Sequence, residues 1–260
     1  MGADIEVFLM QRLPPKDQLI MGIHAIREVL LHAPERLLRI FTEKSKHTSP
    51  GKKELLALSE AKHIPISLIP FDLLTQMTGS ESHQSFAAHV KGRPLLDVAQ
   101  FLEQIEGRER VTVLMLDQIF DPQNFGALLR AAECLGASAV VWSKNRGADL
   151  TPTAAKASSG ASELLPLIRI SNLAEAVSQF QQGGFEAVAA VLKPEAENAL
   201  SFAFAPRTLL IVGSEGEGIQ PLIQKRADRL LYLPMHGKIA SLNVAQTTAV
   251  LLARCCGDTP

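Results

Sequence analysis

The stretch DPQNFGALLRAAECLGA, Asp121 to Ala137, decides how the second half of this chain folds. It follows the apolar run VTVLMLD, Val111 to Asp117, which predicts a strand buried on both faces. Beyond the turn, apolar residues recur at helical spacing until Gly136. A buried strand leading through a turn into a helix is the building unit of a parallel α/β sheet.

The same alternation continues to the end of the chain. Strands alternating with helices predict a mainly parallel sheet covered by helices on both faces. The expected strands are SAVVW (138–142), LPLIRI (165–170), FEAVAAVL (185–192), TLLIVG (208–213) and RLLYLP (229–234). The expected helices are TPTAAKASSG (151–160), NLAEAVSQFQQGG (172–184) and LNVAQTTAVLLARCC (242–256).

A smaller α/β pattern precedes this sheet. Helical periodicity covers residues 21–33, 53–64 and 71–79, and short strands are expected over residues 37–43, 64–69 and 85–92. We therefore divide the chain into four parts. They are an N-terminal extension (1–18), a small α/β domain (19–95), a linker with a short helix (96–109) and a larger α/β domain (110–260).

The charge balance argues against a generally basic nucleic-acid binder. The 260 residues carry a net charge of −1, and the sequence pI is about 6.7. Any RNA contact must therefore come from a local patch. The candidate patch is Arg36–Lys62, with Lys44, Lys46, Lys52 and Lys53 as candidate RNA-binding residues. A solvated loop and helix face is the alternative interpretation of the same charges.

Membrane and metal partners are not expected. No apolar run reaches the ~18 residues of a membrane span, and the N-terminal residues lack the basic start of a signal peptide. We expect a cytoplasmic protein. The three cysteines lack the spacing of zinc ligands, so no metal site is predicted.

The opening stretch carries the first candidate group for chemistry. Asn124 suits the N-cap of the predicted helix, and Gly126 lies one turn before Arg130 on the same stripe. A glycine there leaves space beside the guanidinium, whose flat fork of donors suits a phosphate. A surface arginine that lays its stem over apolar neighbours is the alternative.

The second candidate stretch is TLLIVGSEGEGI, Thr208 to Ile219. A strand runs into glycines that allow a backbone to approach a ligand closely. Their spacing is not the dinucleotide fingerprint, which argues against a nucleotide-binding oxidoreductase. Glu215 and Glu217 would repel a pyrophosphate, so a ligand with a positive centre fits better.

The third stretch is LYLPMHGKIASLNVAQTTAVLL, Leu231 to Leu252. A strand is followed by a glycine-containing loop, and Ser241 and Asn243 stand at the entry to an apolar helix. Either residue could simply cap that helix. In an open parallel sheet, ligands bind outside the carboxyl ends of the strands, where all three stretches are expected to meet.

Together and in this order, the three stretches resemble the motifs of the SpoU/TrmH family of RNA ribose 2′-O-methyltransferases. The resemblance covers residues 111–256. The N-terminal unit is similar to the small substrate-binding domain of one subgroup, which includes the bacterial enzyme that methylates a guanosine of 23S ribosomal RNA. The chain departs from that subgroup at Ser85, where glycine usually follows His-Gln.

The resemblance implies the cofactor S-adenosylmethionine, a deep trefoil knot and a homodimer with its active site near the subunit interface. The knot would be formed by the chain from about Thr208 to the last helix. The implied cofactor-binding residues are Gly213, Leu233, Met235, Leu242, Ala190 and Val191. The implied catalytic residues are Arg130, Asn124, Glu215, Ser241 and Asn243.

The implied reaction is methylation of a ribose 2′-hydroxyl in ribosomal RNA, with a guanosine of 23S rRNA as the expected target. A tRNA ribose methyltransferase and a catalytically silent RNA-binding protein of ribosome assembly are the alternatives. Arg130 has the central role in the family. Because a guanidinium stays protonated in proteins, we interpret Arg130 as a clamp on RNA phosphate or a stabiliser of the developing alkoxide, not as a base.

Overall fold

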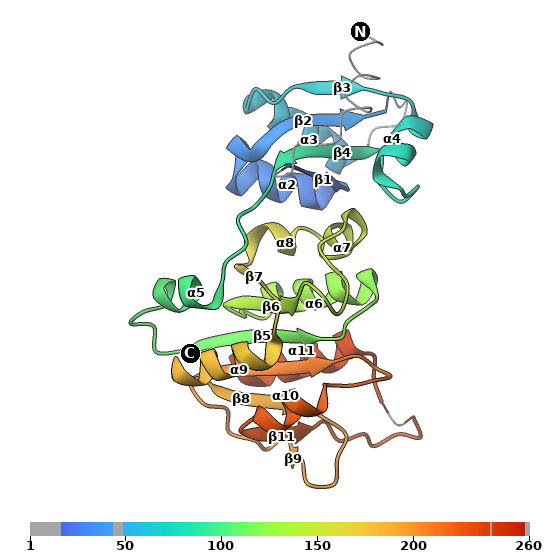
Figure 1. Ribbon diagram of the computed structural model, residues 1–260. Coiled ribbons are helices and arrows are strands. Elements are labelled where there is room, and N and C mark those ends of the chain that lie inside the picture. The colour runs from blue at the N-terminus through green and yellow to red at the C-terminus, as the bar shows by residue number, and fades with distance from the viewer. Residues whose placement is uncertain (1–16, 44–48, 240, 258–260) are drawn as a thin grey trace. The chain divides into compact units, whose positions relative to one another are not determined.

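The computed structural model describes residues 17–43, 49–239 and 241–257. The chain divides between Pro94 and Leu95 into two compact units (Figure 1). Each unit has its own hydrophobic core. Most of the predicted extension 1–18, together with Lys44 and Lys46, lies outside the described residues.

The second unit is built on a seven-stranded parallel sheet with the order β7-β6-β5-β10-β8-β11-β9. The mainly parallel α/β sheet expected from the alternating sequence pattern is thereby confirmed. Its strands are β5 (Val111–Asp117), β6 (Ala139–Ser143), β7 (Leu167–Ile170), β8 (Glu186–Ala190), β9 (Glu197–Asn198), β10 (Arg207–Gly213) and β11 (Arg229–Tyr232).

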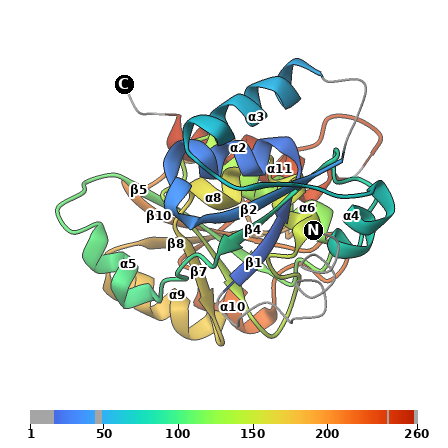
Figure 2. The ribbon, with the colours of Figure 1, turned by 90° about the horizontal axis from the view of Figure 1, so that it is seen from above.

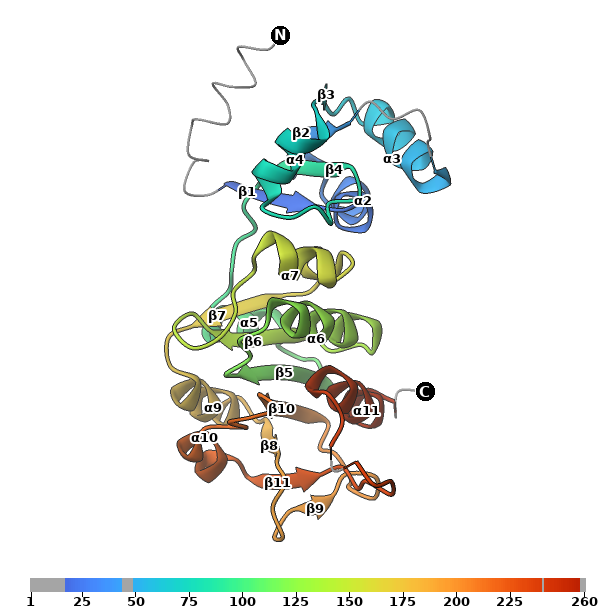
Figure 3. The same ribbon diagram turned by 90° about the vertical axis from the view of Figure 1, so that its right-hand side faces the viewer.

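Helices cover both faces of this sheet. They are α5 (Val98–Gln104), α6 (Pro122–Cys134), α7 (Pro152–Ala157), α8 (Ala161–Leu164), α9 (Leu173–Gln182), α10 (Pro221–Arg226) and α11 (Val244–Cys256). Helices α6 and α11 lie on one side of the strands, and α9 and α10 lie on the other (Figure 3). Seen from above, α5 joins α9 and α10 on their side (Figure 2).

The alternation of side chains along the strands explains the two cores. In β5, Leu114 and Leu116 pack with α6 and α11, whereas Val113 and Met115 pack with α5 and α9. Every residue of β5 is buried, because both of its faces are covered. This is why the strand appears in the sequence as a continuous apolar run.

The segment 96–109, which we predicted to be a linker with a short helix, contains α5. Val98 and Phe101 of this helix are buried in the core of the second unit. The backbone before α5 is also attached to the sheet, since Leu96 N donates to Leu167 O at 2.9 Å. The helix thus packs as part of the second unit.

The first unit has a four-stranded mixed sheet with the order β1-β4-β2-β3. Its elements are β1 (Asp17–Met21), α2 (Ile23–His32), a 3-10 turn η1 (Pro34–Arg36), β2 (Leu37–Thr42), α3 (Pro50–Ala61), β3 (Ile66–Leu68), α4 (Phe71–Thr78) and β4 (Phe86–Lys91). Helices α2 and α3 share one core with the sheet, and α4 packs in a second core. Strand β1 was not predicted, because its five residues run directly into the helical pattern of α2.

Ser85, which stands where glycine usually follows His-Gln, lies in the turn before β4. Ser85 has φ +64°, a left-handed conformation that favours glycine. Its hydroxyl donates a hydrogen bond to the Glu43 carboxylate, which offsets part of that strain. The preceding Gln84 accepts a hydrogen bond from Ile23 N at 3.1 Å and so serves the start of α2.

No described helix is long and apolar enough to cross a membrane.

The space beside Gly126 is used differently from our prediction. It is not left open beside the Arg130 guanidinium. A Cβ at position 126 would lie 2.4 Å from Ala154 O and 2.5 Å from Ala157 Cβ. The glycine therefore lets the backbone of α7 approach α6 closely.

Gly126→Ala is expected to lower the free energy of unfolding by about 2 kcal/mol, since overpacking a filled site typically costs about 1–3 kcal/mol. Denaturant unfolding followed by circular dichroism would measure it. The control is Gly51→Ala in α3, where a Cβ would meet only Ile23 Cγ2 at 3.9 Å. That variant should unfold at the same or slightly higher denaturant concentration. Equal midpoints for Gly126→Ala and the wild type would contradict the packing argument.

Candidate functional site

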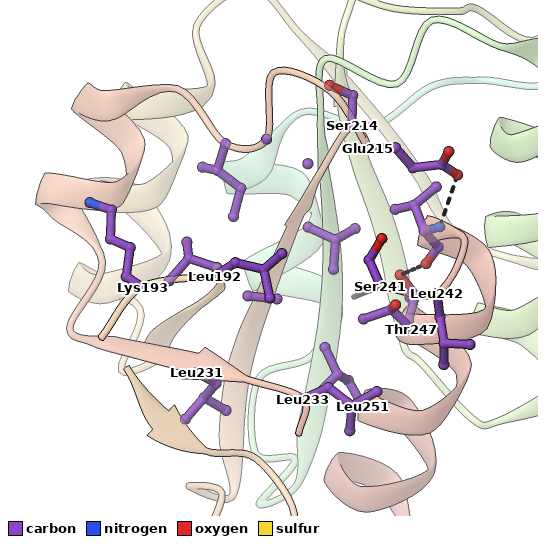
Figure 4. Close-up of a pocket in the computed structure, with 18 of the residues that line it drawn as sticks. Leu192, Lys193, Ser214, Glu215, Leu231, Leu233, Ser241, Leu242, Thr247 and Leu251 are labelled. Atoms are coloured by element: carbon purple, nitrogen blue, oxygen red, sulfur yellow. Dashed lines mark hydrogen bonds between the residues drawn. The ribbon is translucent and has the colours of Figure 1, made fainter. Parts of the chain in front are cut away.

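A pocket of about 320 Å³ lies at the carboxyl ends of β8, β10 and β11. It is closed by the loop after β10, the segment after β11 and the first turns of α11 (Figure 4). The three strands are neighbours and parallel, so their carboxyl ends meet at one edge of the sheet. This is the edge at which open α/β sheets bind ligands.

The six residues predicted to bind a cofactor all line this pocket. They are Ala190, Val191, Gly213, Leu233, Met235 and Leu242. Three different strands and the approach to α11 supply them, so they are distant in the sequence and adjacent in the fold. Their role in binding stays a prediction, but the structure gives them one common cavity.

Gly213 makes the close turn of the loop possible. A Cβ at this position would lie 2.2 Å from Gly218 O. The loop folds back on itself there, because Gly218 N donates to Ser214 O at 3.0 Å. Gly218 itself has φ +68°. Residues 214–219 all line the pocket, so a larger side chain at position 213 would displace its wall.

Three of the predicted catalytic residues converge at the start of α11. The Glu215 carboxylate accepts a hydrogen bond from Val244 N at 3.2 Å (Figure 4). Asn243 caps the helix by accepting from Ala245 N at 2.8 Å, and its Nδ2 donates to Asn124 Oδ1 at 3.0 Å. The capping role considered for Asn243 is confirmed, and the same side chain also joins α11 to α6.

Asn124 does not cap α6, contrary to our prediction. The helix begins at Pro122, and the N-cap is Asp121, whose carboxylate accepts from Gln123 N and Asn124 N. Asn124 therefore lies within the first turn of α6. Its side-chain amide does not cap the helix, and its Oδ1 accepts a hydrogen bond from Asn243 Nδ2.

Ser241 and Arg130 occupy different places. Ser241 lines the pocket beside Leu242. Arg130 is exposed on α6, six residues beyond Asn124, and its Nη1 donates to Ser159 Oγ at 3.2 Å. Arg130 is not among the residues that line the pocket. Glu215, Asn243 and Asn124 are thus linked by hydrogen bonds, with Ser241 nearby, whereas the described contacts of Arg130 are separate.

Two carboxylates give the pocket its electrostatic character. Glu215 and Glu217 line it, and Lys193 is the basic residue among its lining side chains. This balance favours a ligand with a positive centre, as expected from the sequence. Beneath the loop lies the buried carboxyl of Asp117, whose pKa is raised by burial and lowered in smaller part by hydrogen bonds from Gln220.

Sequence reasoning missed several residues of the pocket. Leu192 and Lys193 follow the end of β8, and Thr247 and Thr248 lie in the first turns of α11. The first two follow a strand whose end we had already placed at the site, so position alone could have indicated them. The threonines gave no signal, because they look like ordinary polar positions of an amphipathic helix.

Within residues 17–43, 49–239 and 241–257, no group of three or more His, Cys, Asp or Glu side chains is arranged to hold a metal ion. The described lysines of the candidate RNA patch, Lys52 and Lys53, lie in the first turn of α3 in the first unit. Lys53 is exposed, and Lys52 is half-buried with its ammonium 6.0 Å from the centre of the Phe86 ring.

Each of the two units matches a known protein family. The sequence model of the SpoU rRNA Methylase family matches residues 111–253, and that of RNA 2′-O ribose methyltransferase substrate binding matches residues 19–95. The chain is 34% identical over 239 residues to the 23S rRNA (guanosine-2′-O-)-methyltransferase RlmB of Escherichia coli. That alignment covers 90% of this chain and 96% of the relative.

Solved structures show the same fold. The SpoU methyltransferase AviRb from Streptomyces viridochromogenes, in complex with AdoMet, matches with a TM-score of 0.77 at 21% identity, covering 96% of this chain and 94% of its own. The A. aeolicus TrmH/SpoU tRNA modifying enzyme matches with a TM-score of 0.52 at 24% identity, covering 62% of this chain and 81% of its own.

The family model matches residues 111–253, and the Escherichia coli relative is matched over nearly its whole length. The chain therefore belongs to the SpoU rRNA Methylase family.

Proposed function

We propose that this protein methylates the 2′-hydroxyl of a ribose in ribosomal RNA, with S-adenosylmethionine as the methyl donor and a guanosine of 23S rRNA as the target. The observation that carries the proposal is the pocket at the ends of β8, β10 and β11, lined by all six residues of the motif-based prediction. The curated relative, matched over 90% of this chain, is a 23S rRNA guanosine methyltransferase.

The pocket suits S-adenosylmethionine. Its volume is at the lower end of the roughly 300–1,000 Å³ of small-molecule sites. Val212, Leu231 and Leu251 give it an apolar lining for a flat base, and Glu215 and Glu217 complement a cationic centre. When bound, S-adenosylmethionine supplies an electrophilic methyl group on a sulfonium.

The chain's own residues would orient the ribose and handle its proton. Glu215 and Asn243 fix the start of α11 beside the pocket, and Asn124 is attached to the same point. Ser241, on the pocket wall, would hydrogen-bond the attacking hydroxyl. Much of the acceleration would come from holding that hydroxyl in line.

Arg130 would act on the RNA. It is exposed and carries donors suited to a phosphate, so we assign it to clamping the backbone near the reacting ribose. Its described contact is with the neutral Ser159 hydroxyl, which an anion can displace.

The knot, the homodimer and the cytoplasmic location are parts of this proposal. Strand β10 lies between β5 and β8, the chain then forms β11 on the far side of β8, and α11 returns to pack with α6. This return of the C-terminal segment across the sheet supports the proposed knot, in which the end of the chain would pass through a loop formed by an earlier segment. In the proposed homodimer the active site lies near the subunit interface, and a ribosomal RNA substrate supports a cytoplasmic location.

The first unit favours ribosomal RNA over tRNA. It matches the substrate-binding model over residues 19–95, and the 23S rRNA methyltransferase of Escherichia coli aligns with 90% of this chain. The domain division proposed from the sequence assigns residues 19–95 to substrate binding and residues 110–260 to catalysis.

The first test is methyl transfer from labelled S-adenosylmethionine to RNA lacking its native methylation. We expect label in 23S rRNA at sites that resist alkaline cleavage, because a 2′-O-methyl group removes the nucleophile of that cleavage. Label in tRNA would support the tRNA alternative instead. Tight cofactor binding without transfer to free RNA or to ribosomal particles would support the silent RNA-binding protein.

Arg130→Lys tests the clamp. Lysine keeps the charge but loses the two-pronged fork, so kcat/KM for RNA should fall about tenfold or more. S-adenosylmethionine affinity, measured by calorimetry, should stay unchanged. The matched control is Arg108→Lys, an exposed arginine in the loop after α5. Full turnover by Arg130→Lys would refute the assignment.

Lys52→Gln/Lys53→Gln tests the RNA patch. If both ammonium groups contact phosphate, the slope of log affinity against log salt should become shallower by roughly 1–2. Filter binding to a 23S rRNA fragment over a salt series would measure it. The charge-conserving Lys52→Arg/Lys53→Arg protein is the control and should keep the wild-type slope. An unchanged slope in the glutamine variant would remove these lysines from the RNA contact.

A further inference from the structure

Asp117 is a buried carboxylate that the proposed chemistry does not use. It is the last residue of β5 and is fully buried. In the sheet it lies opposite Gly213, the residue at which β10 ends and the pocket loop begins. A carboxylate in such a place needs hydrogen-bond donors, because burying it without them is strongly unfavourable.

One residue supplies two donors to this carboxylate. Gln220 N donates to Asp117 Oδ2 and Gln220 Nε2 donates to Asp117 Oδ1, both at 2.7 Å. The remaining amide oxygen of Gln220 accepts from Arg146 Nη1 at 2.8 Å. Each donor is paired with an acceptor. Because Asp117 can only accept and Arg146 can only donate, the Gln220 amide has one orientation that satisfies both.

Gln220 is where the pocket loop ends. Residues 214–219 line the pocket, and the loop is held at its other end by the pairing of Gly213 with Asp117. The neighbouring Gln118 also reaches this loop, since its Nε2 contacts Gly218 O at 3.4 Å. Both ends of the loop are thus fixed to the end of β5, the near end by strand pairing and the far end by the Asp117 carboxylate.

We infer that Asp117 and Gln220 are positioning residues that hold the 214–219 loop in its ligand-binding shape, so that the cofactor meets a formed wall. The inference rests on the proposed function for the identity of the ligand. Preorganisation of this kind raises affinity because less order has to be created on binding.

The hydrogen-bond pattern makes a demanding test possible. In Asp117→Asn, two donors of residue 220 face a side chain with one acceptor and one NH2 group. Turning the Gln220 amide around would satisfy the substituted side chain but place an NH2 group against Arg146. In Gln220→Glu, two carboxylates face each other. Each single variant therefore contains one mismatched contact.

Exchanging both residues restores every partner. In the double variant Asp117→Asn/Gln220→Glu, the amide oxygen at position 117 accepts from the backbone N–H of residue 220. The NH2 group at position 117 donates to the new carboxylate, whose second oxygen accepts from Arg146. The pair is matched again, with its hydrogen-bond direction reversed.

Asp228 provides a control with the same pattern of hydrogen-bond donors, although its side chain is exposed and that of Asp117 is buried. Its carboxylate also accepts from one backbone N–H and one glutamine amide, Ala187 N at 2.8 Å and Gln181 Nε2 at 3.0 Å. None of these three residues lines the pocket. Asp228→Asn thus changes the same pattern of donors in the same unit, at an exposed carboxylate and without touching the loop.

The experiment measures binding of S-adenosylmethionine and of the non-reactive S-adenosylhomocysteine by calorimetry, below the unfolding temperature of every variant. Each single variant should raise Kd about tenfold, because a mismatched buried donor or acceptor is expensive. In turnover assays, KM for S-adenosylmethionine should rise more than kcat falls. The double variant should return to within about threefold of wild type, and Asp228→Asn should bind like wild type.

Unchanged affinity in Asp117→Asn would overturn the inference. If that variant does not fold, the folded double variant decides: weak binding there, with kcat and KM unrestored, would equally overturn it. A wild-type protein that binds neither ligand would refute the proposed function itself. That result is distinct, because it appears before any substitution is made.

Discussion

The pairing of β10 with both β5 and β8 is the constraint on which the site depends. It brings the end of β10 beside Asp117 on one side and, through β8, the end of β11 on the other. Three segments that are far apart in the sequence thereby open at one edge of the sheet. A pocket made largely from backbone turns and apolar side chains needs this register, since a shift of one residue would move every side chain of a strand to the opposite face of the sheet and displace the loop that follows it.

Two glycines allow close packing next to this sheet edge. Gly126 admits α7 to within contact of α6, and Gly213 lets the pocket loop fold back over its own start. At the same edge, Glu215 and Asn243 hold the first turn of α11, so the helix that closes the pocket is attached to the loop that forms its wall. The residues that would bind the ligand are therefore also the residues that complete the fold locally.

Much of this architecture could be predicted from the sequence, for physical reasons that differ between elements. The run Val111–Asp117 is mostly apolar and wholly buried because both faces of β5 are covered, so its place inside a parallel sheet could be predicted. Strand β1 could not be predicted, since Asp17–Met21 merges with the pattern of α2. The motif residues of the pocket were found by their order along the chain. Gln220 was missed, because a polar residue after a glycine loop has no pattern until Asp117 is seen opposite it.

Arg130, in the middle of α6, differs from three arginines whose charge is paired within the fold. Arg27, Arg169 and Arg229 each meet a carboxylate, so their charge is already neutralised within the fold. Arg130 is exposed, and the side-chain contact described for it is a hydroxyl, Ser159. A guanidinium hydrogen-bonded to a neutral group keeps its charge and most of its donors for an incoming anion. Since α6 also carries Asn124, which is joined to the start of α11 through Asn243, one helix connects the proposed phosphate clamp to the place where the methyl group would be held.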